Sequence, residues 1–161
     1  MDGIRWKAKW RIERFANSEA FKNKVPYAIS EFAGNLALNE GINELFLLLV
    51  GGGGTAYSSG NAYLGVGDSD TEAAAAQTGL QAAVNKAWEA MVATYPTDPP
   101  VSEEVVFRAI FGVAAANYAW KEFTVVNAAN DGGVNLCRKV SSEGTKSVGE
   151  TWTLTYTLGF S

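Results

Sequence analysis

Residues 150–160 read Glu-Thr-Trp-Thr-Leu-Thr-Tyr-Thr-Leu-Gly-Phe and form the most regular segment of the chain. Large apolar side chains at Trp152, Leu154, Tyr156 and Leu158 alternate with threonines. Successive side chains of a β-strand point to opposite faces of a sheet, so this pattern predicts a strand with one buried apolar face and one polar face.

Three segments upstream resemble it in being rich in branched and aromatic residues: 105–113, 118–127 and 134–141. Turn-forming residues separate them, and Asn130-Asp-Gly-Gly133 is typical of a hairpin between the second and third. Four strands at this spacing predict a mainly β (α+β) fold, an antiparallel β-sandwich or barrel-like body with one or two short helices.

Residues 39–50 change to a helical spacing of apolar side chains, with Ile42, Leu45, Phe46 and Leu49 on one stripe. Asn39 is the expected N-cap, and Glu40 lies in the first turn. The helix should end at Gly51–Gly54, which we interpret as a C-cap leading into a turn. A phosphate-binding loop is disfavoured there, because that motif needs a preceding strand and a following Gly-Lys-Ser/Thr.

Residues 61–67 are predicted to form a short strand, followed by a turn and a short helical piece over 72–76. Ser69 or Asp70 would cap that piece. Asp68 and Asp70 could together hold a cation, but a calcium loop needs more oxygen ligands at set intervals, so capping is favoured.

Residues 83–95 fit two patterns. Val84, Trp88, Met91, Val92 and Tyr95 form a helical stripe, whereas alternate residues from Lys86 to Val92 fit one side of a strand. The periodicity favours a helix, which should end before Pro96.

Near the N-terminus, apolar and basic side chains alternate without a break: Ile4, Arg5, Trp6, Lys7, Ala8, Lys9, Trp10, Arg11, Ile12. This predicts a strand whose apolar face needs a partner, either on its own sheet or on a neighbouring molecule. We favour a neighbour, and so divide the chain into a basic N-terminal β arm (1–25) and a single β-rich body (26–161). The residues expected to bind the partner are Ile4, Arg5, Trp6, Lys7, Lys9, Trp10, Arg11 and Ile12.

The charge distribution agrees with such an arm. Residues 1–25 hold seven basic and three acidic side chains, whereas the remainder holds six basic and fourteen acidic ones. A basic segment of this kind meets an acidic partner or is simply the solvated face of a strand. Nucleic acid is disfavoured as a partner, because the body is acidic and carries no nucleic-acid-binding motif.

The composition argues against most enzyme classes. The chain has no histidine and one cysteine, Cys137, which excludes histidine-based catalysis, histidine metal ligands and an internal disulfide. The adjacent carboxylates Glu103 and Glu104 would point to opposite faces of a strand and cannot flank one bond. We expect no catalytic residues, no metal and no cofactor. The apolar run 45–50 is too short to span a membrane.

Several ordered motifs resemble a known family. They are Asn35-Leu-Ala-Leu-Asn-Glu-Gly-Ile-Asn-Glu-Leu45, Asn61-Ala-Tyr-Leu-Gly-Val-Gly-Asp-Ser69, Gln77-Thr-Gly-Leu-Gln81, Phe107-Arg-Ala109, Asn117-Tyr-Ala-Trp-Lys-Glu-Phe123, Asn135-Leu-Cys-Arg-Lys-Val140 and Gly144-Thr-Lys146. Together the set resembles small structural (virion) proteins of tailed bacteriophages, most closely their capsid decoration or cement proteins, over about residues 26–158.

The resemblance implies a non-enzymatic protein on the outside of a capsid that staples neighbouring subunits. Its partners would be the major capsid protein or other virion subunits, with a homo-oligomer, most often a trimer, and no membrane. It would be made in the host bacterial cytoplasm and located in the virion. It also implies a strand rather than a helix near residues 86–95. Two alternatives stay open: a tail, neck or fibre protein of the same virion, or a glycan- or host-surface-binding β-sandwich, which exposed aromatic residues such as Tyr57 and Tyr63 would support.

Overall fold

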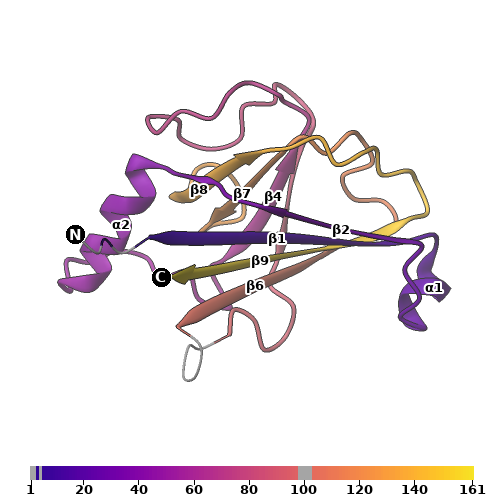
Figure 1. Ribbon diagram of the computed structural model, residues 1–161, viewed down its shortest axis with the longest axis horizontal. Coiled ribbons are helices and arrows are strands. Elements are labelled where there is room, and N and C mark those ends of the chain that lie inside the picture. Colours follow the sequence, from indigo (N-terminus) through magenta and orange to yellow (C-terminus); the bar gives the residue numbers. More distant parts are fainter. Residues whose placement is uncertain (1–2, 4, 98–102) are drawn as a thin grey trace.

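The computed structural model describes residues 3, 5–97 and 103–161. It is a mainly β structure of two antiparallel sheets packed face to face, which confirms the predicted sandwich class (Figure 1). Sheet A contains, in spatial order, β2 (Ala28–Ala33), β1 (Trp6–Phe15), β9 (Thr151–Phe160) and β6 (Glu104–Phe111). Sheet B contains β3 (Leu36–Ala37), β8 (Asn135–Val140), β7 (Glu122–Val126), β4 (Tyr63–Gly67) and β5 (Lys86–Ala90).

The segment with the most regular alternation becomes β9, a central strand of sheet A. Its apolar side chains Trp152, Leu154 and Tyr156 are buried in the core between the sheets. Its threonines therefore lie on the outer face of sheet A. The predicted strands at 61–67, 105–113, 134–141 and 150–160 correspond to β4, β6, β8 and β9, whereas only residues 122–126 of the strand predicted over 118–127 form a strand, β7. β7 and β8 pair antiparallel across the predicted hairpin.

The N-terminal strand is part of the body, so the prediction of a separate arm over residues 1–25 is wrong. β1 lies between two strands of its own sheet, pairing along its whole length with β9 and from Lys9 to Arg14 with β2. The physical reason is that its apolar face covers the chain's own core. Trp10 and Ile12 are completely buried, and the Trp10 ring lies 4.3 Å from that of Tyr156.

The predicted helix over 39–50 is confirmed as α2 (Asn39–Leu49), although its N-cap is Leu38 rather than Asn39 and makes no side-chain capping bond. Gly51, with φ +68°, follows the C-cap Val50 in the left-handed conformation that favours glycine. The other helix is α1 (Ser18–Lys22), capped by the Asn17 side chain.

Residues 72–76 are not helical, so the helix predicted there is wrong. That segment belongs to a long loop, residues 68–85, whose conformation is set by contacts with sheet B. None of the helices in the described part of the chain is long and apolar enough to span a membrane.

The helix favoured over residues 83–95 is also wrong, because residues 86–90 form β5 along the edge of sheet B. Strand pairing overrides the helical spacing here. Trp88 lies opposite Gly65 of β4, and a Cβ on that glycine would lie 2.7 Å from the indole ring. Beyond β5 the chain crosses to sheet A, where Met91 bridges Ala109 of β6.

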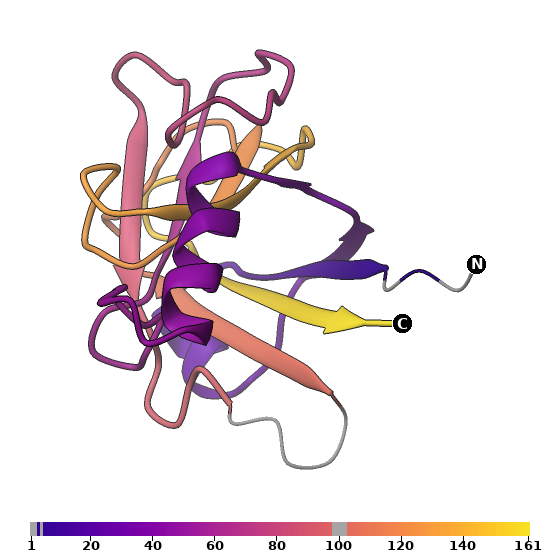
Figure 2. The same ribbon diagram turned by 90° about the vertical axis from the view of Figure 1, so that its left-hand side faces the viewer.

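The two sheets are thus joined at both sides, which gives the sandwich its barrel-like character. On one side β5 leads onto β6, and on the other β2 of sheet A continues directly into β3 of sheet B. Figure 2 looks at the end of the sandwich where α2 lies, with sheet A to the right and sheet B to the left.

Removal of β1 should abolish cooperative folding rather than release a folded body, because sheet A would lose a central strand and the core would lose Trp10. We expect a variant lacking residues 1–15 to show no cooperative urea transition. Trp10→Ala should lower the free energy of unfolding by about 3–5 kcal/mol. The exposed change Lys7→Ala is the control and should stay within about 0.5 kcal/mol. A truncated chain that unfolds cooperatively would contradict this topology.

Candidate interaction face and its buried supports

The predicted partner-binding residues are divided between the two faces of β1. Lys7, Lys9 and Arg11 lie on the outer face of sheet A, whereas Trp6, Trp10 and Ile12 lie on the inner face. Trp6 is half-buried: its indole N–H donates to the Tyr156 hydroxyl (3.3 Å), and its ring packs edge-on against Phe160 (5.8 Å).

Trp10 and Ile12 therefore cannot anchor the strand to a neighbouring molecule, and that expectation is wrong. Arg5 is exposed, and its backbone pairs in both directions with Ser161 at the C-terminus (2.7 and 3.0 Å). Ile4 lies outside the described residues. Of the predicted residues, Arg5 and Lys7 are the exposed cations that form no ion pair with any described residue, so they are available for a partner.

A charged row crosses the outer face of sheet A. Arg11 binds Glu31 of β2 (2.7 Å) and Glu13 (3.1 Å), and Lys9 also binds Glu31 (3.1 Å). Arg108 of β6 reaches Glu13 from the other side (3.5 Å). The hydrogen bonds from Arg11 and Lys9 hold the pKa of the Glu31 carboxyl below its usual range. Lys9 and Arg11 are thus largely neutralised by neighbouring strands, which sequence alternation alone does not reveal.

Two depressions lie on this face, one at each end of the charged row. The first, of about 770 Å³, is lined by residues of the first half of β1, the end of β2 and the end of β9, including Lys7, Phe32 and Thr157. The second, of about 780 Å³, lies beside α1 and is called the α1 groove below; its lining includes Phe15, Phe21 and Tyr95.

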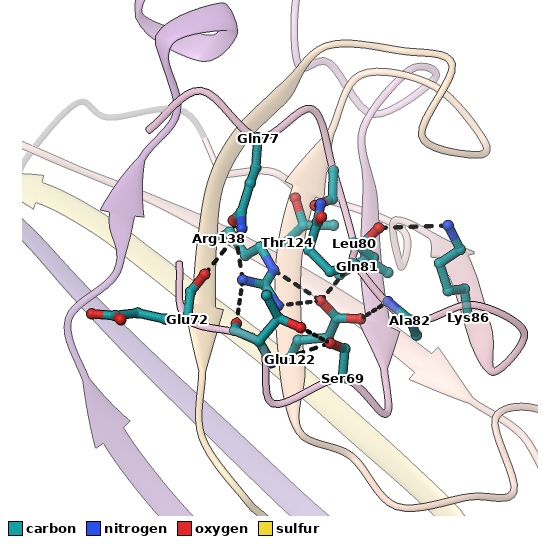
Figure 3. A network of polar contacts seen from close by, with 12 residues as sticks. Ser69, Glu72, Gln77, Leu80, Gln81, Ala82, Lys86, Glu122, Thr124 and Arg138 are labelled. Carbon is teal, nitrogen blue, oxygen red and sulfur yellow. Dashed lines mark hydrogen bonds and ion pairs between the residues drawn. The ribbon is translucent and has the colours of Figure 1, made fainter. Parts of the chain in front are cut away.

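The outer face of sheet B is covered by the loop 68–85, and a buried ion pair holds the loop there (Figure 3). Glu122 of β7 and Arg138 of β8 are both fully buried, with the Arg138 Nη2 2.7 Å from the Glu122 carboxylate. The same carboxylate accepts hydrogen bonds from the backbone N–H groups of Gln81 and Ala82 (both 2.8 Å). Arg138 in turn donates to the Thr71 carbonyl (2.8 Å) and the Gln77 side chain (3.1 Å).

A second carboxylate fixes the same loop further along. Asp131, in the β7–β8 turn, accepts from the backbone N–H of Leu80 (3.2 Å) and binds Lys86 at the start of β5 (3.2 Å). Glycines leave room for these groups: a Cβ on Gly67 would collide with the Glu122 carboxylate, and Gly79 has φ +124° beside Asp131. A loop without secondary structure is therefore fixed by buried charge.

The two glutamates of α2 also form hydrogen bonds within the protein. Glu40 accepts from the Asn135 backbone N–H (2.7 Å), and the buried Glu44 accepts from the Thr55 N–H (2.5 Å) and from the Asn127 side chain (3.1 Å). Gly41 packs so closely on β8 that a Cβ would lie 2.5 Å from the Leu136 carbonyl oxygen.

This docking turns much of the apolar stripe of α2 outward. Ile42 and Leu45 are half-buried, whereas Phe46 is 60% and Leu49 79% exposed. Leu47 and Val50 are exposed as well. The apolar spacing correctly predicts a helix, but it does not predict that the helix packs through its carboxylates.

The other groups considered for chemistry have structural roles or lie on the surface. Asp68 accepts from the Asn85 side chain (2.6 Å), and Asp70 lies 3.6 Å from Lys121. The hydroxyl of Ser69 accepts from the Thr71 N–H, but no helix follows. Within residues 3, 5–97 and 103–161, no group of three or more His, Cys, Asp or Glu side chains is placed to hold a metal ion.

The motifs that carry the resemblance to phage structural proteins meet in these buried networks. Gly65 and Gly67, Gln77 to Gln81, Glu122 and Arg138 come from four separate motifs and join on sheet B. Lys146 from a further motif is buried and donates to the Gly112 carbonyl (2.8 Å) and the Asn117 side chain (2.7 Å). The order and spacing of these motifs in the sequence thus reflect contacts inside the fold. Comparison of the chain with protein-family models, curated proteins and solved structures found no match.

Breaking the buried pair on one side should destabilise the protein strongly. We expect Glu122→Gln to lower the free energy of unfolding by about 3–5 kcal/mol, because Arg138 would remain buried without its counter-charge. Hydrogen exchange should accelerate first at Gln81 and Ala82, whose N–H groups bind that carboxylate. The control Glu72→Gln removes an exposed carboxylate from the same loop and should leave both measurements unchanged. Equal effects of the two changes would contradict the assigned role.

The only cysteine should be inert in the native protein. Cys137 is completely buried, and desolvation raises the pKa of its thiol to about 11. Reaction with a thiol reagent at pH 8 should therefore be negligible in buffer and complete in denaturant. Mass spectrometry measures the extent of labelling. Rapid labelling of the folded protein would contradict this prediction, because it would show that this part of the core opens readily.

Proposed function

We propose that this protein is a non-enzymatic structural component of a tailed-bacteriophage virion, a decoration or cement protein that binds the outside of the capsid and holds neighbouring subunits together. The proposal rests on the motif resemblance and on one structural observation. An amphipathic helix docks through Glu40 and Glu44 and presents Phe46, Leu49 and Val50 to solvent. Large exposed apolar side chains gathered in one place are typical of surfaces that another protein covers.

The α2 surface, defined as Phe46, Leu47, Leu49 and Val50, lies at one end of the sandwich, where the C-terminus also emerges (Figures 1 and 2). It carries no charge, since residues 45–55 include no acidic or basic side chain. We assign it to contacts with the major capsid protein or with other virion subunits, including further copies of this chain in a homo-oligomer, for which a trimer is favoured. The protein would be made in the host bacterial cytoplasm and located on the virion.

The outer face of sheet A offers a complementary, polar contact. Arg5 and Lys7 are exposed beside the charged row, and neither forms an ion pair with any described residue. In the proposed assembly these cations steer the subunit onto an acidic neighbour, while the apolar α2 surface supplies most of the binding energy. Many weak contacts of this kind, repeated over a closed shell, reinforce one another.

The two alternatives differ in how they fit the structure. A tail, neck or fibre subunit would need the same kind of covered surface, and only the location in the particle separates it from a cement protein. A glycan-binding site finds less support: Tyr57 and Tyr63 are half-buried, and the Tyr57 hydroxyl donates to the Val134 carbonyl (3.1 Å). All five tryptophans are buried or half-buried.

The proposal is tested by measuring the copy number of the protein in purified particles with quantitative mass spectrometry and its location with electron cryo-microscopy. A capsid decoration protein should be present in hundreds of copies at regular positions on the shell. About a dozen copies at one vertex would instead support a tail or neck component. Absence from particles would contradict a virion function, and a glycan array would then be the next assay.

A paired substitution tests the α2 surface directly. Phe46→Ser with Leu49→Ser should leave the free energy of unfolding within about 1 kcal/mol, because both side chains are largely exposed, yet reduce occupancy on particles at least tenfold. The matched control is Val84→Ser with Val148→Ser, which removes two side chains that are 85% and 82% exposed elsewhere. Equal occupancy of the two double variants would show that α2 is not the contact.

A further inference from the structure

The α1 groove is a built feature of the outer face of sheet A. Its floor includes Ile29, Glu13 and Ile110, which lie in one row across the strands, with Thr153 between the last two. One wall is α1, where Phe21 packs edge-on against the buried Phe15 (5.2 Å).

The opposite wall is the segment that follows β5. It is tied to β6 by hydrogen bonds from the Val92 N–H to the Arg108 carbonyl (2.9 Å) and from the Thr97 N–H to the Val106 carbonyl (3.0 Å). Both walls are thus anchored to the sheet, and a groove of about 780 Å³ lies within the size range of ligand-binding clefts.

The lining of the groove is mainly apolar. It includes Phe15, Phe21, Ile29, Val92, Tyr95 and Ile110. Ile29 is 48% exposed, and Val25 on the adjoining loop is 63% exposed, so apolar surface continues from the groove onto its rim. Such a lining favours a ligand with aliphatic or aromatic side chains.

The charge of the groove is positive. Its one carboxylate, Glu13, already binds Arg11 (3.1 Å) and Arg108 (3.5 Å). Lys22 and Lys24 line the groove, are exposed, and form no ion pair with any of the described residues. The charge that complements these free lysines is negative. The groove therefore favours a ligand that carries carboxylates close to its apolar groups.

The position of the groove favours an extended chain over a compact ligand. β2 pairs with β1 on one side only and is the edge strand of sheet A. Ile29 of that strand lines the groove, so the open backbone edge of β2 runs beside it. An extended peptide can bind an open strand edge while it places alternate side chains in an adjoining groove.

We propose that the α1 groove binds an extended acidic segment of a partner protein, with a large apolar side chain held between Phe21 and Tyr95 and carboxylates next to Lys22 and Lys24. This goes beyond the proposed function and does not depend on it, because the groove, its charge and the strand edge belong to the isolated chain.

The test is a selection of random twelve-residue peptides displayed on filamentous phage against the purified full-length protein. The enriched peptides should combine aspartate or glutamate with aromatic or aliphatic residues. The best of them, made as a fluorescent synthetic peptide, should bind in an anisotropy titration. Its twin with lysine in place of each acidic residue should bind at least tenfold more weakly.

Two variants locate the binding. Lys22→Ser with Lys24→Ser, and separately Ile29→Ser, should each weaken binding of the acidic peptide at least tenfold while the thermal midpoint stays close to that of the parent protein. The matched control is Ser58→Glu with Ser59→Glu, which lowers the net charge by the same amount at exposed positions outside the groove and should bind normally.

Three results would overturn the proposal. The first is a selection that enriches no peptides, or enriches basic ones. The second is acidic peptides whose binding is unaffected by the Lys22, Lys24 and Ile29 changes, which would place them elsewhere on the surface. The third is self-association, seen in sedimentation and abolished by Ile29→Ser, which would assign the groove to a second copy of the chain. None of these results bears on the copy number in particles, so this inference and the proposed function fail separately.

Discussion

The structure depends on the pairing of the two ends of the chain. β1 and β9 are each ten residues long and pair along their whole length, so sheet A exists only when residues 6–15 meet residues 151–160. That contact brings Trp10 onto Tyr156 and places β2 and β6 on either side of the pair. Contacts so distant in the sequence carry a large loop-closure entropy, and folds dominated by them form slowly.

The second constraint is the buried charge on sheet B. Glu122 and Arg138 are shielded from water, and such a pair is tolerated only when its remaining hydrogen-bonding groups are satisfied. Here the loop 68–85 supplies hydrogen-bond partners to both members of the pair, through Gln81 and Ala82 for Glu122 and through Thr71 and Gln77 for Arg138. The pair and the loop therefore require each other, which explains how a long segment without regular secondary structure holds one conformation.

The two surfaces assigned to partners follow from these internal requirements. Because α2 uses Glu40 and Glu44 to dock, its apolar residues are left for solvent or for another protein. Because β1 is internal to the sheet, its basic face becomes a row bonded to Glu31 and Glu13, with a depression at each end of the row. Both proposed partner surfaces are thus consequences of how the core forms.

Local patterns in the sequence predict the β-rich class, the hairpin turn, the helix at 39–50 and strands at 61–67, 105–113, 118–127, 134–141 and 150–160, because alternation, turn residues and helical spacing are local properties. They also place Trp6 and Trp10 correctly on one face of a strand. Which molecule that face covers depends on how the whole chain packs, since a strand of this pattern fits its own sheet as well as a neighbour's. Residues 86–90 show the same limit: their spacing favours a helix, but pairing with β4 makes them a strand. The outward direction of the α2 apolar stripe depends on contacts with residues far away in the sequence, and so does the buried ion pair of Glu122 and Arg138. No local sequence pattern contains information about such contacts.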